Sequence, residues 1–117
     1  MKTAVDIVIG LIAHEHIWIL ILEMFLWTHR IGLKAFGQTL EAAESAKVLA
    51  ANQGLYNGFL AAGLVWGLIG GEWQVKLFFV LCVLIAGIYG GMTAKRSILV
   101  VQALPALIAL LLLLAIR

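Results

Sequence analysis

The chain has 117 residues, of which 64% are hydrophobic and only 12% are charged, and its formal net charge is +2. A soluble domain carries about 25% charged residues, so this composition excludes an ordinary soluble domain and predicts an integral membrane protein. The length allows about four membrane-spanning helices of roughly 20 residues each, with no separate soluble domain. The small positive charge does not indicate nucleic-acid binding. A single cysteine, Cys82, excludes a disulfide framework within one copy.

Apolar runs and the breakers between them predict an all-α fold, an antiparallel four-transmembrane-helix bundle that forms one domain over residues 1–117. The predicted spans cover about residues 5–27, 40–69, 75–92 and 98–116. Thr39 is placed to cap the second helix, and no breaker interrupts that helix before Gly70 and Gly71. Pro105 lies inside the fourth span, where it removes a backbone donor and is expected to kink the helix.

Basic residues are divided unequally between the two ends of this bundle. The end with the two longer connections carries five of them: Arg30, Lys34, Lys47, Lys95 and Arg96. The end with both termini carries three: Lys2, Lys76 and Arg117. Because lysine and arginine accumulate in cytoplasmic loops, we expect the loops 28–48 and 93–97 to be cytoplasmic and both termini to lie outside.

The first apolar run contains ionisable residues that a membrane span rarely holds: His14, Glu15, His16 and Glu23. Their presence makes the run a retained span and not a cleaved secretory signal. His16 and Glu23 are seven residues apart, so they lie on one face of a helix. Ionisable side chains inside a bilayer face the protein interior, a partner or a water-filled cavity. We therefore expect this face to meet polar groups of other spans.

Depth along the helices places one hydrogen-bonding side chain of every span in a common layer. At ~1.5 Å per residue, Glu23 lies about 6 Å inside the end of its span. Side chains at similar depth on the other spans are Asn52, Gln53, Tyr89 and Gln102, and Asn57 and His16 lie deeper. The part toward the termini is almost wholly apolar. This pattern predicts a polar pocket open to one side, in which the Glu23 carboxylate contacts an amide of the second span.

Four strings in the chain resemble a known family: HIWILILEMFLW at 16–27, KVLAANQGLYNGFLAAGL at 47–64, AGIYGG at 86–91 and QALPALIAL at 102–110. They are similar to small bacterial membrane proteins catalogued as domain of unknown function 1304. The resemblance implies a four-helix protein of the bacterial inner membrane. It implies these motif positions: His16, Glu23, Asn52, Gln53, Tyr56, Asn57 and Gln102. His14 and Glu15 fall outside the motif, and Ala103 stands where the family has glycine. The resemblance implies no particular activity.

Three functional hypotheses remain open at this point. In the first, a polar pocket binds a small molecule or lipid and serves transport or proton-coupled handling of that ligand, with His16 and Glu23 at its centre. Its ligand-binding or proton-relay residues are His16, Glu23, Asn52, Gln53, Tyr56, Asn57, Tyr89 and Gln102. In the second, His16 and Glu23 are the acid and base of a membrane-embedded enzyme. In the third, the polar layer only fixes helix packing in a structural or accessory subunit.

Neither a metal site nor a particular cofactor is indicated. His14 and His16 point about 200° apart on a helix, so they cannot bind one ion together without distortion. Glycines at four-residue spacing allow close helix packing, either within one bundle or at a homodimer interface: Gly54 and Gly58, Gly63 and Gly67, and Gly87 and Gly91. The expected partners are the lipid bilayer, a small-molecule or lipid ligand, and a second copy of the chain.

Overall fold

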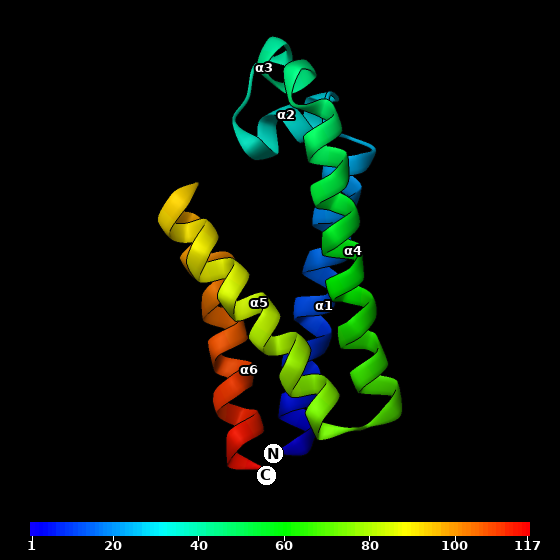
Figure 1. Cartoon of the computed structure of the whole chain (residues 1–117), viewed down its shortest axis with the longest axis vertical. Helices are drawn as coiled ribbons and strands as arrows, with labels where there is room; N and C mark the ends of the chain where they lie inside the picture. The colour runs from blue at the N-terminus through cyan, green and yellow to red at the C-terminus, as the bar shows by residue number, and fades with distance from the viewer. The chain divides into compact units, whose positions relative to one another are not determined.

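The computed structural model describes all residues, 1–117, and consists of helices joined by short connections (Figure 1). In chain order the elements are α1 (Lys2–Met24), α2 (Arg30–Phe36), α3 (Leu40–Ser45), α4 (Lys47–Gly70), α5 (Trp73–Thr93), the π-helical turn η1 (Leu99–Ala103) and α6 (Leu104–Ala115). The predicted all-α class is confirmed. Two of the helices, α1 and α5, are long and apolar enough to cross a membrane.

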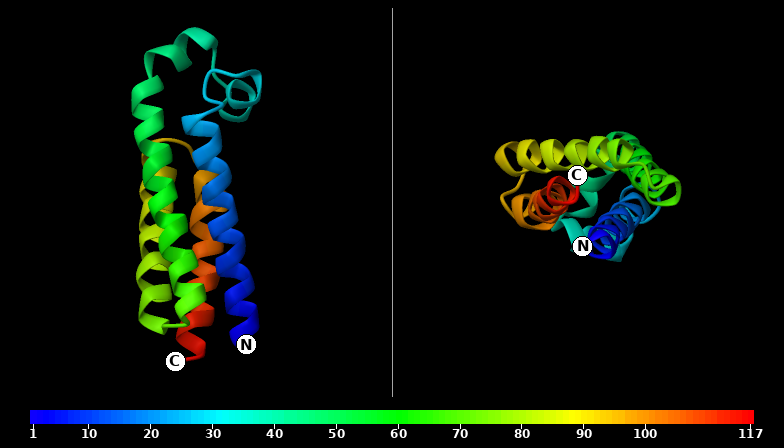
Figure 2. Two further views of the ribbon diagram at one scale, coloured as in Figure 1. Left: turned by 90° about the vertical axis from the view of Figure 1, so that its right-hand side faces the viewer. Right: turned by 90° about the horizontal axis from the view of Figure 1, so that it is seen from below.

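The chain divides into two compact units, which are described separately. The terminal unit comprises residues 1–14 and 60–117, and the loop unit comprises residues 15–59. Within the terminal unit, α5 packs along η1 and α6. The N- and C-termini lie at the same end of this unit, as an even number of antiparallel helical segments requires (Figures 1 and 2).

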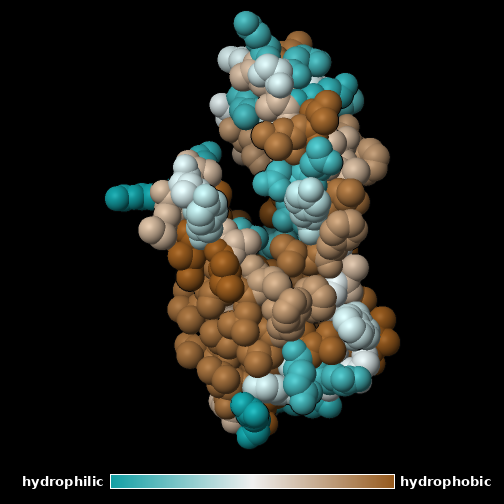
Figure 3. All heavy atoms as spheres, in the orientation of Figure 1, coloured by the Kyte–Doolittle hydropathy of each residue, from teal (hydrophilic) through white to brown (hydrophobic).

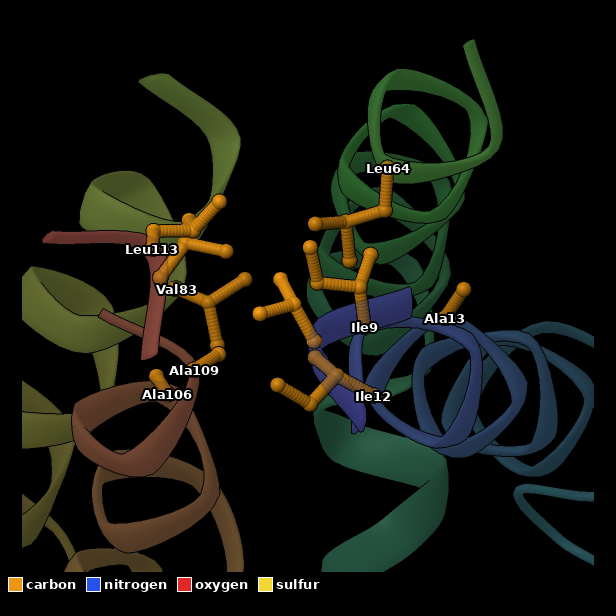
Figure 4. Close-up of a cluster of buried hydrophobic side chains, with 10 residues drawn as sticks. Ile9, Ile12, Ala13, Leu64, Val83, Ala106, Ala109 and Leu113 are labelled. Atoms are coloured by element: carbon orange, nitrogen blue, oxygen red, sulfur yellow. The ribbon is translucent and has the colours of Figure 1, made fainter. Parts of the chain in front are cut away.

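The core of the terminal unit is built from aliphatic side chains of all its helical segments. Ile9 and Ile12 of α1 and Leu64 of α4 point toward Val83 of α5 and Leu113 of α6 (Figure 4). None of these side chains contains a polar atom, so the contacts between them are dispersion contacts in a closely packed interior. This core holds the first turns of α1 against the last turns of α4.

Each glycine pair is used for packing inside the chain. A Cβ at Gly54 would lie 2.6 Å from Cγ of Met24, so α1 and α4 approach closely in the loop unit. A Cβ at Gly87 would lie 2.6 Å from the backbone nitrogen of Ala103, and a Cβ at Gly67 would lie 3.2 Å from the backbone nitrogen of Lys76 on α5. The three glycine pairs therefore allow close packing of α1 on α4, of α4 on α5 and of α5 on η1. Packing within the chain is therefore one use of these glycines, and a homodimer interface stays a prediction.

The predicted continuous helix over residues 40–69 is interrupted once. Helix α3 ends at Ser45, α4 begins at Lys47, and Ala46 between them has φ −108° and ψ 9°. The start of α3 is as expected, because the Thr39 hydroxyl accepts a hydrogen bond from the Ala42 amide at 3.2 Å. No proline or glycine stands at the interruption, so the local sequence gives no signal for it.

A tertiary hydrogen bond accounts for the interruption. The indole N–H of Trp27 donates to the carbonyl oxygen of Ala43 at 2.8 Å, and the Ala46 amide donates to the same oxygen at 3.2 Å. In a continuous α-helix this oxygen would accept the amide of Lys47 instead. The Trp27 ring also packs on Phe36 of α2, with the ring centroids 5.0 Å apart. Trp27 therefore holds both short helices of the loop unit in place.

Pro105 distorts the backbone before it, as expected. The amide of Leu104 donates to the carbonyl oxygen of Leu99, which is the five-residue spacing of a π-helical turn. Proline has no N–H, and its ring collides with the carbonyl four residues earlier, here that of Val101. A wider turn relieves this collision, and α6 then continues with Pro105 near its start.

Candidate functional site

The expected contact between Glu23 and an amide of the second predicted span is present. In the loop unit, Nδ2 of Asn57 on α4 donates to Oε1 of Glu23 on α1 at 2.7 Å. Gly54 allows this approach, because a Cβ there would lie 3.1 Å from Cβ of Glu23. Asn57 engages one of the two carboxylate oxygens, and it is a neutral partner. Both side chains are half-buried.

His16 lies two turns before Glu23 on the same face of α1. Its side chain is completely buried, at 0% exposure, and it has an interaction partner. His14 is exposed, so the two histidines point to different sides, as helix geometry predicts. No three His, Cys, Asp or Glu side chains in the structure gather into a possible metal site.

Glu15 has a carboxylate oxygen, Oε1, that is shielded from solvent without a hydrogen-bond partner. A shielded polar atom without a partner is costly. Glu15 is therefore the one acidic residue of the loop unit with a buried carboxylate oxygen that lacks a hydrogen bond. The family motif does not include Glu15.

The remaining polar residues of α4 form a stripe beside Asn57. The polar stripe consists of Asn52, Gln53 and Tyr56, which share one helix face with Leu49 at the i, i+3, i+4, i+7 spacing, and all four residues are exposed. The Tyr56 ring lies near that of Phe59, with the centroids 6.3 Å apart. Asn57, in contrast, is turned to α1, so the structure separates the amide that binds Glu23 from the other two.

The other two predicted site residues belong to the terminal unit. Tyr89 is exposed near the end of α5, and Gln102 of η1 is half-buried and has an interaction partner. The predicted layer of polar groups is thus divided, with six members in residues 15–59 and these two in residues 60–117. That all eight act together stays a prediction.

A buried salt bridge was missed by the sequence analysis. In the terminal unit, Nζ of Lys76 forms a salt bridge of 2.8 Å with Oδ1 of Asp6, and Lys76 is only 3% exposed. From the sequence, Lys76 counts among the basic residues that orient the bundle and an almost wholly apolar terminal end is expected, whereas the structure buries Lys76 and pairs it with Asp6. A signal was present: Asp6 and Lys76 stand at similar distances from the starts of two spans that run in the same direction.

Comparison with known proteins identifies the family. Residues 10–114 match the family described as protein of unknown function (DUF1304), and the chain belongs to this family. It is similar to the uncharacterized protein YpaA of Lactococcus lactis subsp. lactis (strain IL1403), with 31% identity over 105 residues that cover 86% of this chain and 87% of the relative. No solved structure matches the chain. The resemblance inferred from the four strings is confirmed.

Proposed function

We propose that this chain is a four-span integral membrane protein that binds a small molecule or lipid at Glu23 and the polar stripe of α4, with Glu23 able to exchange a proton. The membrane part is supported by the distribution of apolar surface. Leu11 of α1 is 65% exposed and Ile85 of α5 is 66% exposed. The surface of α5 and α6 turned to the viewer in Figure 3 is almost uniformly hydrophobic. In a soluble protein such surface would be buried, whereas a bilayer covers it.

The fourth span and the orientation follow the same reasoning. Helix α4 has 24 residues, which is long enough to cross a bilayer, although Asn52, Gln53 and Asn57 make its first half more polar than α1 or α5. Helix α6 with η1 supplies the last apolar segment, over Leu99–Ala115. Since Lys76 is neutralised by Asp6, the free basic residues are even more unequally divided, which favours cytoplasmic loops 28–48 and 93–97.

The ligand proposal rests on the hydrogen bonding and the exposure of the polar groups around Glu23. Asn57 engages Oε1 of Glu23 alone, and Asn52 and Gln53 stay exposed on the same part of α4. Hydrocarbon offers no hydrogen bonds, so exposed amides inside a span need a partner with polar atoms. A ligand that donates to Oε2 of Glu23 and bonds the amides satisfies both requirements.

Native mass spectrometry of the protein, released from its own membranes in mild detergent, tests the proposal. We expect a bound small molecule or lipid on the wild type and on the control Glu44→Gln, which changes an exposed glutamate of α3. We expect Glu23→Gln to remain folded and to lose that ligand, because an amide keeps the shape of the side chain but lacks its charge. A wild type without ligand, or a ligand retained by Glu23→Gln, would overturn the proposal and leave helix packing as the role of Glu23.

A further inference from the structure

Helix α2 has one packed side, which fixes its rotation about its own axis. Gly32 is buried, and a Cβ there would overlap the carbonyl oxygen of Leu26. Phe36 packs on the ring of Trp27, which is itself anchored by its hydrogen bond to α3. The directions in which the other side chains of α2 point are therefore set by the chain.

Two exposed stripes remain on α2. Arg30 and Lys34 are four residues apart and neighbours on the helix surface, with about 5–6 Å between their Cβ atoms. Both are exposed, and neither forms an ion pair with the acidic residues of α3. The second stripe consists of Ala35 and of Ile31, which is 55% exposed. Hydrophilic side chains gather over α2 and α3 in Figure 3.

The pattern of unpaired cations beside an exposed aliphatic side chain is typical of a helix that lies in a membrane interface. Only residues 25–29 separate α1 from α2, and Gly37 at φ 64° ends α2. If α1 spans the membrane, Arg30 and Lys34 lie within a few residues of the hydrocarbon edge, at the depth of lipid phosphates.

We propose that Arg30 and Lys34 bind the phosphate of an anionic phospholipid while Ile31 inserts among the acyl chains. The inference rests on the membrane-spanning part of the proposed function and is independent of any ligand at Glu23. A basic residue near an anionic surface contributes a factor of about five to lipid affinity, so the pair contributes about 30-fold. Arg30 and Lys34 stand one turn apart on a helix whose packed side fixes its rotation, whereas Lys95 and Arg96 are adjacent in a turn held by backbone hydrogen bonds.

The test uses the full chain in nanodiscs of phosphatidylcholine mixed with phosphatidylglycerol, and counts the phosphatidylglycerol molecules retained in native mass spectrometry. We expect Arg30→Gln with Lys34→Gln to lower the affinity for phosphatidylglycerol about 30-fold. The matched control is Lys95→Gln with Arg96→Gln, which removes the same charge from another exposed site, measures the general attraction between charges and should cause a clearly smaller loss. Ile31→Asn should also weaken retention, without any change in charge.

Three outcomes would overturn the site. Equal losses in both double variants would mean general attraction between charges, and no loss in either would mean no binding at α2. Displacement of the lipid by inorganic phosphate alone would assign the cations to a free anion. Carbonate extraction of native membranes distinguishes a missing lipid site at α2 from a chain that does not span the membrane. A chain released by carbonate contradicts the membrane-spanning part of the proposed function.

Discussion

Asp6 and Glu23 of α1 lie in different units, and these two acids have different partners. In the terminal unit, Asp6 is 35% exposed and is neutralised by the buried ammonium group of Lys76 at 2.8 Å. In the loop unit, Glu23 accepts a hydrogen bond from the neutral amide of Asn57 at 2.7 Å. A compensated ion pair holds two helices in register, whereas a carboxylate with only a neutral donor still has its charge available for a proton or a ligand. The contacts pair the first acid with a charge and the second with a neutral amide, and a chemical role for Glu23 stays a proposal.

Removal of Asp6 should have the largest effect on stability. Asp6→Ala leaves the ammonium of Lys76 buried without a counter-charge, which costs about 3 kcal/mol. Unfolding of the detergent-solubilised protein by denaturant measures this loss. The control Glu72→Ala, at an exposed position four residues before Lys76, should change stability by less than about 0.5 kcal/mol. If the two variants unfold together, the salt bridge does not hold the terminal unit.

The glycine contacts should also differ between the units. Gly87→Ala forces a methyl group against the backbone of Ala103, which cannot move alone, and should cost about 1–3 kcal/mol. Gly58→Ala meets only Cδ1 of Leu20, the end of a flexible side chain, and should cost much less. Gly10→Ala meets nothing within 4 Å and should stabilise α1 by up to about 1 kcal/mol. Thermal unfolding of the three variants ranks them, and a reversed order of Gly87 and Gly58 would contradict the packing described.

The hydrogen bond of Glu23 should contribute less than the salt bridge of Asp6. Asn57→Leu and Glu23→Leu should each cost on the order of 1 kcal/mol, the usual value for an interhelical hydrogen bond in a membrane. The double variant should cost less than the sum, since both changes remove one interaction. Glu23→Gln should be nearly silent in the same unfolding assay. Additive losses in the double variant would show that the two side chains do not interact.

The two anchoring tryptophans give the smallest expected effects. Trp73 donates to the carbonyl oxygen of Leu113 at 2.8 Å and lies under Arg117, so Trp73→Phe should cost about 1 kcal/mol. Trp27→Phe should cost less, because the freed oxygen of Ala43 can accept the amide of Lys47 and extend the helix. Amide hydrogen exchange checks this mechanism: protection at Lys47 should rise in Trp27→Phe and stay unchanged in Trp73→Phe.

Features that depend on one helix or on its ends could be predicted from the sequence alone. Apolar runs gave the all-α class, Thr39 the start of α3, Gly71 with its φ of 72° the end of α4, and Pro105 the distortion before α6. Helix periodicity also separated His14 from His16. These features depend on steric limits and hydrogen bonds between residues a few positions apart. Such short-range effects can be predicted from the identities of neighbouring residues.

Only the tertiary structure decided which polar groups meet. Depth along the spans predicted an amide partner for Glu23, but it could not select Asn57 over Asn52, because that choice depends on the side of α4 that packs on α1. The Asp6–Lys76 pair and the Trp27–Ala43 hydrogen bond behind the interruption at Ala46 depend in the same way on residues 70 and 16 positions apart. The indole N–H of Trp27 reaches the carbonyl oxygen of Ala43 only when the segment between these residues folds back. The end of α3 is therefore set by a tertiary contact, which the local sequence does not predict.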